Sequence, residues 1–441
     1  MVNLNDQMDL IRQGTVEIFP EDELARNIEN SISSGRPLRV KMGIDPTTAD
    51  IHLGHMVGFG KMRQFQDAGH TGVVIIGDWT AQIGDPTGLT QVRPSLSQDD
   101  VKANAASYVS QLNKVIDPEK TEFKWQTEWF DGFDLAKIIE LMRQVTAAQM
   151  LAHETFAQRL KNNQPLGVHE LMYPVLMAYD SVAVKSDVEL GGIDQKFNIL
   201  VGRDLQRQAG QKPQAAVLMQ LLDGVGTPGS KMGKTADNFI SVTADASDMF
   251  GKAMRITDEQ IEQYFALTTA ATPLELSEIG GQLADPSVNP MHVKEKLGCA
   301  IVERYHGAQA ATDAKAEFDR LFRSPKTAAP VVSAAADTAT EGAASGTSDG
   351  AATVATIVPS TSPLPDNVPE FRIRGRLSVW ICELLRTTEM ADTNSEAKRL
   401  IDQGAVSLDD VPVLDSNTEL EIADGAMLKV GKRRFARLIR I

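Results

Sequence analysis

Apolar and polar stretches alternate between residues 38 and 78 in a way that predicts a strand, a helix and a second strand. Leu38–Ile44 is a short apolar run, and Asp45-Pro46-Thr47-Thr48 ends it. Residues suited to a buried helix face then recur at positions 53, 56, 57, 60 and 65, until Ala68-Gly69-His70 closes the helix. Val73–Ile76 is an unbroken run of β-branched residues, as in strands buried on both faces. We therefore predict a βαβ unit with parallel strands.

Most of the remaining chain before residue 323 is predicted to be helical. One or two helices are expected over residues 4–35, with a helix start at Pro20 followed by acidic residues. Residues 98–163 are predicted to be mostly helical, including Leu135–Leu151, and residues 245–322 to be helical. Val188–Leu190 is predicted to be a strand, followed by a turn at Gly191-Gly192 and a helix opened by residues 193–195.

Composition changes abruptly after residue 325. Residues 326–365 are Ala, Thr, Ser and Gly with scattered Pro, and cannot bury enough apolar surface to offset the entropy of ordering, so they are predicted to be a flexible linker. The tail is predicted to contain a helix with a capping box at Thr393 and Glu396, ended by Gly404, and strands over Val406–Val413 and Met427–Val430. The expected fold class is α/β, with a Rossmann-like parallel-sheet domain and helical insertion over 1–243, a helical domain over 244–325, the linker over 326–365 and a small α+β domain over 366–441.

The overall composition excludes several classes of protein. The 441 residues, 42% of them hydrophobic and 23% charged, are ordinary for a globular protein of two or three domains. A net charge of −15 argues against general affinity for nucleic acid, so any RNA contact requires a local basic patch. Cys299 and Cys382 lack the spacing of metal ligands, and no metal site is predicted. Residues 1–23 lack the apolar core of a signal peptide and no apolar run approaches a membrane span, so a cytoplasmic protein is expected.

The predicted helix of the βαβ unit begins with His52-Leu53-Gly54-His55. Two imidazoles three residues apart in a first helical turn share a face, beside free backbone N–H groups and the positive end of the helix dipole, which suits a polyphosphate. Gly54 has no side chain, so a base or ribose can lie against the backbone there. Taken alone, the motif is equally compatible with a solvated histidine pair or with a metal site that lacks its other ligands.

A second motif, Lys231-Met232-Gly233-Lys234-Thr235, follows the turn-rich segment 224–230. Two lysines on a Gly-rich loop are commonly just solvated charge. Together with the histidine motif and the preceding Pro46, however, the loop resembles the HIGH and KMSKS signatures of class I aminoacyl-tRNA synthetases. GDPTG at 84–88, the segment 171–198 and the end of the chain resemble the bacterial tyrosyl-tRNA synthetases in detail.

This resemblance implies an enzyme that forms tyrosyl-adenylate and pyrophosphate from tyrosine and MgATP, then transfers the tyrosyl group to the terminal ribose of tRNA(Tyr). It also implies a homodimer without a prosthetic group and without DNA or membrane partners. No protein nucleophile is needed, since the tyrosine carboxylate attacks the α-phosphorus, so catalysis depends on alignment and charge stabilisation. By the same resemblance the catalytic residues are His52, His55, Lys231 and Lys234, and the ATP-binding residues are Gly54, Lys231, Lys234 and Thr235.

Candidate amino-acid-binding residues lie on a stripe and a turn. Tyr173, Met177 and Asp180 share a helix face, where a buried carboxylate requires a partner; a helix-capping role for Asp180 is the alternative. Asp85 follows the second strand, where ligands of parallel sheets bind, and a turn-stabilising role is its alternative. The resemblance implies a tyrosine pocket in which Asp180 accepts the phenol proton, lined by Lys41, Asp85, Tyr173, Met177, Asp180, Asp194 and Gln195.

The chain departs from the family pattern at four positions. Lys41 stands where a tyrosine usually shares the phenol contact, and we expect it to keep Asp180 ionised if the two side chains approach. Met177 replaces a glutamine and Ile193 replaces a small hydroxyl residue, while Gly233 replaces the serine of KMSKS. The first three changes concern the amino-acid pocket and leave the ATP site untouched.

The strongest basic cluster of this acidic chain is Lys429–Arg437. Such a cluster is often merely solubilising, but segments 395–408 and 430–435 resemble the S4 RNA-binding fold, which implies RNA contacts by Lys398, Arg399, Lys432, Arg433 and Arg434. Three alternatives stay open. A nucleotidylyltransferase would share the histidine motif but would not need the basic C-terminal segment. A non-catalytic RNA-binding protein would need that segment but not the lysine motif. A related adenylating synthetase would activate a modified aromatic amino acid in place of tyrosine.

Overall fold

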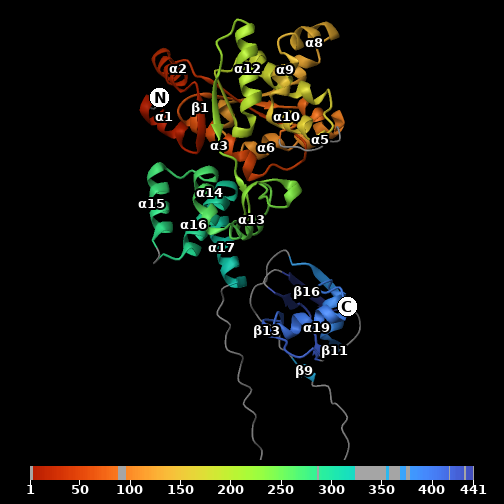
Figure 1. The fold of residues 1–441 in the computed structure, drawn as a ribbon. Helices are drawn as coiled ribbons and strands as arrows, with labels where there is room; N and C mark the ends of the chain where they lie inside the picture. The colour runs from red at the N-terminus through yellow and green to blue at the C-terminus, as the bar shows by residue number, and fades with distance from the viewer. Residues whose placement is uncertain are drawn as a thin grey trace, which may run out of the picture. The chain divides into compact units, whose positions relative to one another are not determined.

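The computed structural model divides into two compact units, Met1–Phe318 and Asp319–Ile441, each with its own apolar core (Figure 1). It describes residues 3–87, 96–285, 288–322, 354–356, 368–373, 378–416, 418–431 and 434–440.

A six-stranded sheet with the order β1-β6-β5-β2-β3-β4 forms the centre of the N-terminal unit. Its strands are β1 (Thr15–Phe19), β2 (Arg39–Ile44), β3 (Thr71–Ile76), β4 (Thr121–Trp125), β5 (Val188–Gly192) and β6 (Ala215–Met219). Strands β2 to β6 pair in parallel and β1 lies antiparallel at one edge. With α3 (Leu53–Asp67) between β2 and β3, the predicted α/β class and βαβ unit are confirmed.

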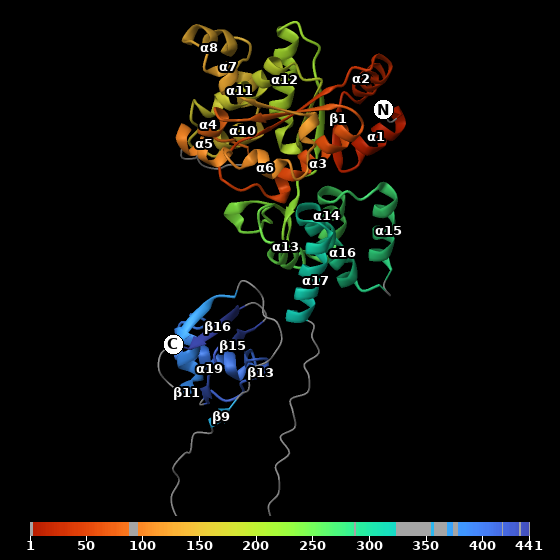
Figure 2. The ribbon, with the colours of Figure 1, turned by 180° about the vertical axis from the view of Figure 1, so that it is seen from behind.

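The two faces of this sheet bury different helices. Val74 and Ile76 of β3 belong to the core that contains α3, whereas Val73 and Ile75 pack with Val184 of α11 (Tyr173–Val184) on the other face. Helix α12 (Lys196–Gln208) packs along α11 and against β5 and β6 (Figure 2). The order of the strands changes direction between β5 and β2, and ligands of open parallel sheets bind beside the carboxyl ends of the strands at such a switch point.

The helices expected over residues 4–35 and the mostly helical character of residues 98–163 are confirmed, but each segment also contains a strand that was not predicted, and two further local predictions were wrong. Strands β1 and β4 fall inside segments predicted to be helical, because each is an edge strand whose apolar residues alternate with polar ones instead of forming a continuous run. The expected helix over Leu135–Leu151 is interrupted after Met142, and Thr146 caps a new helix by accepting a hydrogen bond from the Gln149 N–H. Gly191-Gly192 continues β5 instead of turning.

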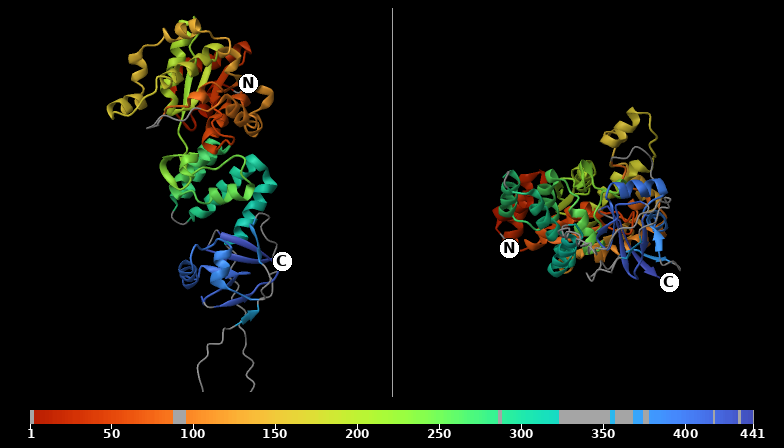
Figure 3. Two further views of the ribbon diagram at one scale, coloured as in Figure 1. Left: turned by 90° about the vertical axis from the view of Figure 1, so that its right-hand side faces the viewer. Right: turned by 90° about the horizontal axis from the view of Figure 1, so that it is seen from below.

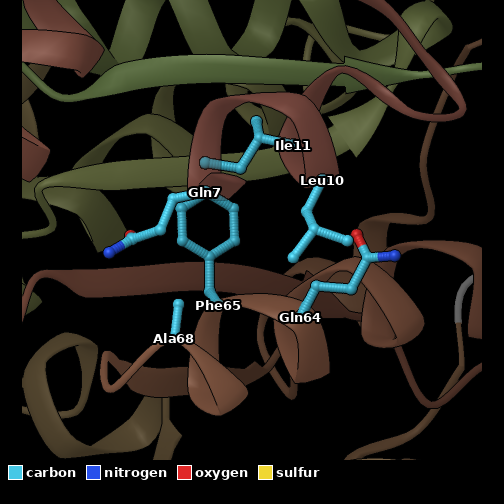
Figure 4. A pocket seen from close by; sticks show the side chains of 6 residues that line it. All are labelled: Gln7, Leu10, Ile11, Gln64, Phe65 and Ala68. Atoms are coloured by element: carbon cyan, nitrogen blue, oxygen red, sulfur yellow. The ribbon is translucent and has the colours of Figure 1, made fainter. Parts of the chain in front are cut away.

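The other elements of this unit up to residue 260 are helices, 3₁₀ turns and a short strand pair. The helices are α1 (Leu4–Arg12), α2 (Glu21–Ser34), α4 (Thr80–Ile83), α5 (Gln98–Ala105), α6 (Tyr108–Leu112), α7 (Thr127–Phe130), α8 (Leu135–Met142), α9 (Ala147–Leu151) and α10 (Glu154–Lys161). Single 3₁₀ turns are η1 (Pro118–Lys120), η2 (Glu170–Met172), η3 (Ile193–Gln195), η4 (Lys234–Ala236) and η5 (Asp258–Gln260), and β7 (Asp223–Gly224) pairs with β8 (Thr227–Lys231). A small pocket between α1 and the last turns of α3 is lined by Gln7, Leu10, Ile11, Gln64, Phe65 and Ala68, so it lies at the end of α3 opposite to its histidines (Figure 4).

Residues 245–322 are helical, as predicted. The helices are α13 (Ala246–Ala253), α14 (Ile261–Thr268), α15 (Pro273–Ala284), α16 (Pro290–His306) and α17 (Ala308–Phe322). Among the described residues, no helix combines the length and the apolar character needed to cross a membrane.

In the described part of the C-terminal unit, two sheets are combined with the helices α18 (Ile381–Thr387) and α19 (Asn394–Asp402), which matches the predicted α+β class (Figure 3). One sheet contains β10 (Glu370–Ile373), β16 (Arg434–Arg440), β15 (Ala426–Val430), β12 (Val406–Leu408) and β13 (Val411–Pro412); the other contains β11 (Ser378–Trp380), β14 (Glu419–Glu421) and β9 (Val354–Thr356). Thr393 caps α19 as predicted, by accepting a hydrogen bond from the Glu396 N–H.

The predicted linker over 326–365 lies almost entirely outside the described residues. Within it, Val354–Thr356 form strand β9, which pairs in parallel with β14, so the structure differs from the prediction at these three residues. The physical reason is local: residues 353–358 are β-branched except for Ala355, and their strand propensity is obscured by the surrounding Ala, Ser and Gly.

Candidate active site

The histidine motif forms the first turn of α3. His52 is the N-cap residue, and its ring stacks on that of His55 with the ring centroids 3.8 Å apart. The His52 N–H donates to Nδ1 of His55 at 3.4 Å, which leaves Nε2 of His55 to carry that ring's proton when it is neutral. Burial, the neighbouring His55 and then Lys234 and Lys231 lower the pKa of His52 to about 2, and burial followed by Lys231 and Lys234 lowers the pKa of His55 to about 4. Both imidazoles are therefore neutral near pH 7.

The lysine motif is brought to this corner by backbone pairing. The Leu53 N–H donates to the Ile240 carbonyl at 3.0 Å, and the Val242 N–H donates to the Ile51 carbonyl at 3.0 Å. Met232 is buried beneath the loop, and a Cβ added to Gly54 would lie 3.6 Å from the Met232 Cβ and 3.0 Å from the His52 ring. The two motifs, far apart in sequence, are thus fixed side by side, with little space for a side chain at position 54.

The two lysines of the motif have different partners. Nζ of Lys231 forms an ion pair with Oδ2 of Asp194 at 2.6 Å, and its side chain is 60% exposed. Nζ of Lys234 donates to Oγ1 of Thr48 at 2.7 Å and to the Asp50 carbonyl at 2.6 Å, in the loop that leads into α3. Thr235 lies in the η4 turn. Two cations therefore flank two neutral imidazoles at a helix N-terminus, which favours an anionic ligand.

A hydrogen-bonded network lies at the carboxyl ends of the strands. The Tyr173 hydroxyl donates to Oδ2 of Asp45 at 2.9 Å, and the Thr80 hydroxyl donates to Oδ1 of Asp45 at 2.7 Å. Thr80 also bonds Oε1 of Gln126, whose Nε2 donates to Oδ2 of Asp180 at 2.9 Å. The network thus connects residues that follow β2 and β4 to two residues of α11.

Asp180 lies inside α11, four residues before its last residue, so the helix-capping alternative is wrong. Its side chain is buried, and among the described residues Oδ1 has no hydrogen-bond partner. Burial raises the pKa of Asp180 to about 8, with Glu189 and Asp45 adding to the rise, while Lys41 and the hydrogen bond from Gln126 oppose it. Asp180 is therefore a buried carboxyl with one unused oxygen, mostly protonated near pH 7 and an acceptor at both oxygens once it ionises near pH 8.

Asp85 stabilises its turn and also contacts Gln195, a second candidate residue of the amino-acid pocket. Oδ1 of Asp85 accepts a hydrogen bond from the Thr87 N–H at 2.9 Å, which stabilises the turn, and Oδ2 accepts one from Nε2 of Gln195 at 2.8 Å. Met177 and Ile193, two of the unusual residues, pack against the same buried cluster, so the substitutions at these positions are adjacent in space.

The prediction that Lys41 keeps Asp180 ionised is wrong. Lys41 lowers the pKa of Asp180, but burial outweighs it and raises that pKa to about 8, and the ion-pair partner of Lys41 is Glu189, with Nζ 2.8 Å from Oε1. Sequence reasoning missed Glu189 and the network residues Asp45, Thr80 and Gln126. A usable signal existed for Asp45, because it directly follows β2, which was predicted, and ligands of parallel sheets bind at such positions.

The candidate RNA-binding residues belong to the C-terminal unit. Lys398 and Arg399 are exposed on α19, and Arg434 is exposed at the start of β16, where it donates to the Met390 carbonyl at 2.8 Å. Lys432 and Arg433 lie outside the described residues.

Comparison with known proteins agrees with this geometry. The family of class I tRNA synthetases (W and Y) matches residues 33–323. The tyrosine–tRNA ligase of Moorella thermoacetica is 40% identical over 98% of this chain and 95% of its own length, and that of Geobacter sulfurreducens is 40% identical over 99% of each chain.

In fold, the chain is similar to the C-terminally truncated mitochondrial tyrosyl-tRNA synthetase of Aspergillus nidulans, with a TM-score of 0.59 and 21% identity over 73% of this chain and 95% of that one. It is equally similar to the tyrosyl-tRNA synthetase of Archaeoglobus fulgidus complexed with L-tyrosine, with a TM-score of 0.59 and 18% identity over 71% of this chain and 100% of that one. The chain therefore belongs to the tyrosine–tRNA ligases, within the class I tRNA synthetase family of the tryptophan and tyrosine enzymes.

Proposed function

We propose that this chain activates L-tyrosine with MgATP and transfers the tyrosyl group to the 3′ end of tRNA(Tyr). The observation that carries the proposal is the unused Oδ1 of buried Asp180, at the same edge of the sheet as the histidine and lysine motifs. A phenol hydroxyl would supply the donor that this oxygen lacks, and a charge-assisted bond is among the stronger hydrogen bonds. Tyrosyl-tRNA synthetases are themselves the established case of a site that rejects phenylalanine because its polar groups would be left unpaired.

In the proposed first step, the tyrosine carboxylate forms a bond to the α-phosphorus of ATP as the bond to pyrophosphate breaks. Neutral His52 and His55 would donate N–H groups to phosphate oxygens, and Gly54 would let the nucleotide lie against the backbone. Lys231 and Lys234 would neutralise the departing pyrophosphate, to which Mg²⁺ remains bound as part of the substrate. Thr235 would contribute to the ATP site from the same loop.

The proposed amino-acid pocket comprises Lys41, Asp85, Tyr173, Met177, Asp180, Asp194 and Gln195. Asp85 and Gln195 are joined by a hydrogen bond, which supports a shared role near the amino group of tyrosine. Asp194 is paired with Lys231, which supports a role at the boundary between the amino acid and the nucleotide.

ATP–pyrophosphate exchange with each amino acid tests the proposal. We expect exchange that depends on tyrosine. Exchange that depends instead on a modified aromatic amino acid would favour the alternative adenylating enzyme, and no exchange with tRNA binding retained would favour a non-catalytic RNA-binding protein. We also propose a cytoplasmic location, since tRNA is charged where proteins are synthesised.

We propose that the C-terminal unit contacts tRNA through Lys398, Arg399, Lys432, Arg433 and Arg434. Ending the chain inside residues 333–353 should leave tyrosyl-adenylate formation intact and lower the efficiency of tRNA charging by about tenfold or more, because phosphate contacts dominate affinity for nucleic acid. Rates of both steps at physiological salt check this. A full-length triple variant, with Lys398, Arg399 and Arg434 changed to Ala, should also lose salt dependence of tRNA binding, whereas Arg26→Ala, an exposed control in the N-terminal unit, should not. Normal charging by the shortened chain would contradict the assignment.

We propose that two copies of the chain form a homodimer that covers the apolar face of α8. Leu135, Ile139 and Met142 are 73%, 47% and 44% exposed at spacings that place them on one stripe, and a cavity of about 410 Å³ lined in part by Phe133 and Ile138 continues the apolar surface. Leu135→Glu combined with Ile139→Glu should convert the dimer to a monomer, because a second copy would have to bury two charges. Sedimentation velocity measures this, and Leu274→Glu, at a leucine 70% exposed on α15, is the matched control. A monomeric wild type would overturn the proposal.

A further inference from the structure

A buried ion pair lies beneath the proposed tyrosine pocket. Lys41 on β2 and Glu189 on β5 are register partners in adjacent parallel strands, with Nζ of Lys41 2.8 Å from Oε1 of Glu189. Their side chains are 0% and 1% exposed. Both lie at the point where the strand order reverses, on the sheet face covered by α11 and α12. Two charges removed from water at such a place are costly unless all their hydrogen-bonding groups are satisfied.

The surroundings of the pair supply hydrogen-bond partners for Lys41 and for one carboxylate oxygen of Glu189, while among the described residues Oε1 of Glu189 has the ion pair with Lys41 but no hydrogen bond. Besides this ion pair, Nζ of Lys41 donates to Oγ of Ser181 at 2.8 Å and to the Met177 carbonyl at 3.2 Å, so Glu189, Ser181 and Met177 match its three N–H groups in number. Oε2 of Glu189 accepts from Oγ of Ser181 at 2.9 Å and from Nε2 of Gln214. Lys41 therefore has no donor left for a substrate, and its influence on tyrosine must pass through α11.

Space for this arrangement is made by α12. A Cβ added to Gly202 would lie 3.1 Å from Oγ of Ser181, 3.1 Å from Nε2 of Gln214 and 3.5 Å from Oε2 of Glu189. Helix α12 thus approaches the Lys41–Glu189 pair at a residue without a side chain. A larger residue at position 202 would press on the side chains that bond Glu189.

The pair acts on the turn of α11 that carries Asp180. The Met177 carbonyl lies one turn before Asp180, and Ser181 is the next residue, so Lys41 is bonded to the backbone before the carboxylate and to the side-chain hydroxyl after it. The charged or titratable groups that face Asp180 are Lys41 from β2, Glu189 from β5, Asp45 after β2 and Tyr173 from α11 itself. Lys41 favours the ionised carboxylate and Glu189 opposes it, so the two members of the pair have opposite effects on the same oxygen atoms.

We propose that Lys41 and Glu189 are positioning residues that determine tyrosine specificity, by holding the α11 turn in place and by balancing the charge on Asp180. This inference rests on the proposed function. It assigns Lys41 an indirect role in place of a direct contact with the phenol, and it adds Glu189 and Ser181 to the residues on which recognition depends.

The test compares the pH dependence of kcat/KM for tyrosine in ATP–pyrophosphate exchange among full-length variants. The phenol donates to Asp180, and the ionised carboxylate is the better acceptor, so activity should rise as Asp180 ionises near pH 8. Glu189→Gln removes the opposing negative charge and should move the midpoint down by about one pH unit, whereas Lys41→Met should move it up by about as much. The double variant, Lys41→Met with Glu189→Gln, should return the midpoint to near the wild-type value.

Controls separate this role from a structural one. Arg39→Met with Glu122→Gln removes a more exposed ion pair between β2 and β4, and should change the melting temperature without moving the midpoint. A shared loss of stability in both single variants, with midpoints unmoved or moved in the same direction, would overturn the proposal. If Lys41→Met does not fold, Glu189→Gln and the double variant still decide, since the first must lower the midpoint and the second must restore it.

The failure of the proposed function would look different. Absence of tyrosine-dependent exchange in the wild type would count against that function. The charge balance would then be read from the carboxyl C=O band of Asp180 in infrared difference spectra taken against Asp180→Asn. If the pH midpoint of this band moves in opposite directions in Glu189→Gln and Lys41→Met, the proposed effect of the two residues on the charge of Asp180 is supported. Equal shifts, or no shift, would refute it.

Discussion

Lys234→Ala is expected to slow tyrosyl-adenylate formation by about two to four orders of magnitude, while the affinity for tyrosine changes by less than about twofold. The charge of Lys234 would be needed mainly as pyrophosphate leaves, so its removal should raise the barrier of the chemical step without weakening the binding of the amino acid. In the structure, Nζ of Lys234 is held against Thr48 and Asp50, directly ahead of the histidine turn. Burial lowers the pKa of Lys234, whereas Asp50 raises it.

Pre-steady-state rates of adenylate formation, with tyrosine affinity measured separately by equilibrium dialysis, test this expectation. Lys252→Ala is a matched control, because Lys252 and Lys234 both lie over the Phe239 ring, at 5.6 and 5.9 Å from its centroid, but Lys252 is outside the motif and pairs with Asp248. A Lys234→Ala rate within about threefold of the wild type, a difference below about 1 kcal/mol, would show that the lysine is not part of the catalytic machinery.

The histidine and lysine motifs could be predicted from the sequence because each is short and contiguous, and the histidine motif contains a glycine where the backbone is approached closely. A Cβ at Gly54 would press on the His52 ring, for example, and no other residue type leaves that space open. The βαβ unit was equally readable, since its second strand is buried on both faces and therefore continuous in its apolar residues. In such segments the local sequence pattern and the tertiary environment favour the same secondary structure, so the pattern alone predicts it.

The edge strands and the buried polar network were not readable in the same way. Strands β1 and β4 are held by pairing with distant segments, and neither has an apolar run of its own. Gln126 and Glu189 are recognisable only once the sheet places them beside Asp180 and Lys41, because a lone Gln or Glu in a strand-like segment carries no sign of its partner. The sequence therefore identifies the motifs expected to bind the nucleotide. The buried side chains that alter the pKa of Asp180 can be identified only when it is known which strands are neighbours in the sheet.

Asp180→Asn is expected to lower kcat/KM for tyrosine activation by about two to three orders of magnitude while changing phenylalanine activation little, so that discrimination between the two narrows. Asn keeps an oxygen for Nε2 of Gln126, but it replaces the unused Oδ1 by an N–H₂ group that cannot accept from a phenol. The loss should therefore fall on the substrate that carries the hydroxyl.

The same substitution should not cost stability, which separates a binding role from a structural one. The folded protein raises the pKa of Asp180 to about 8, so folding takes up a proton between about pH 4 and pH 8. The contribution of this carboxyl to stability is therefore greatest below its unfolded pKa and declines as the pH rises towards 8, and Asp180→Asn should remove that decline. Melting temperatures between pH 5 and 8, measured with kcat/KM for both amino acids, test both parts. Asp409→Asn, which removes a half-buried carboxyl with a raised pKa from the C-terminal unit, should leave discrimination unchanged. If the ratio of kcat/KM for tyrosine to that for phenylalanine is unchanged in a less stable Asp180→Asn protein, Asp180 stabilises the fold and does not bind the phenol hydroxyl.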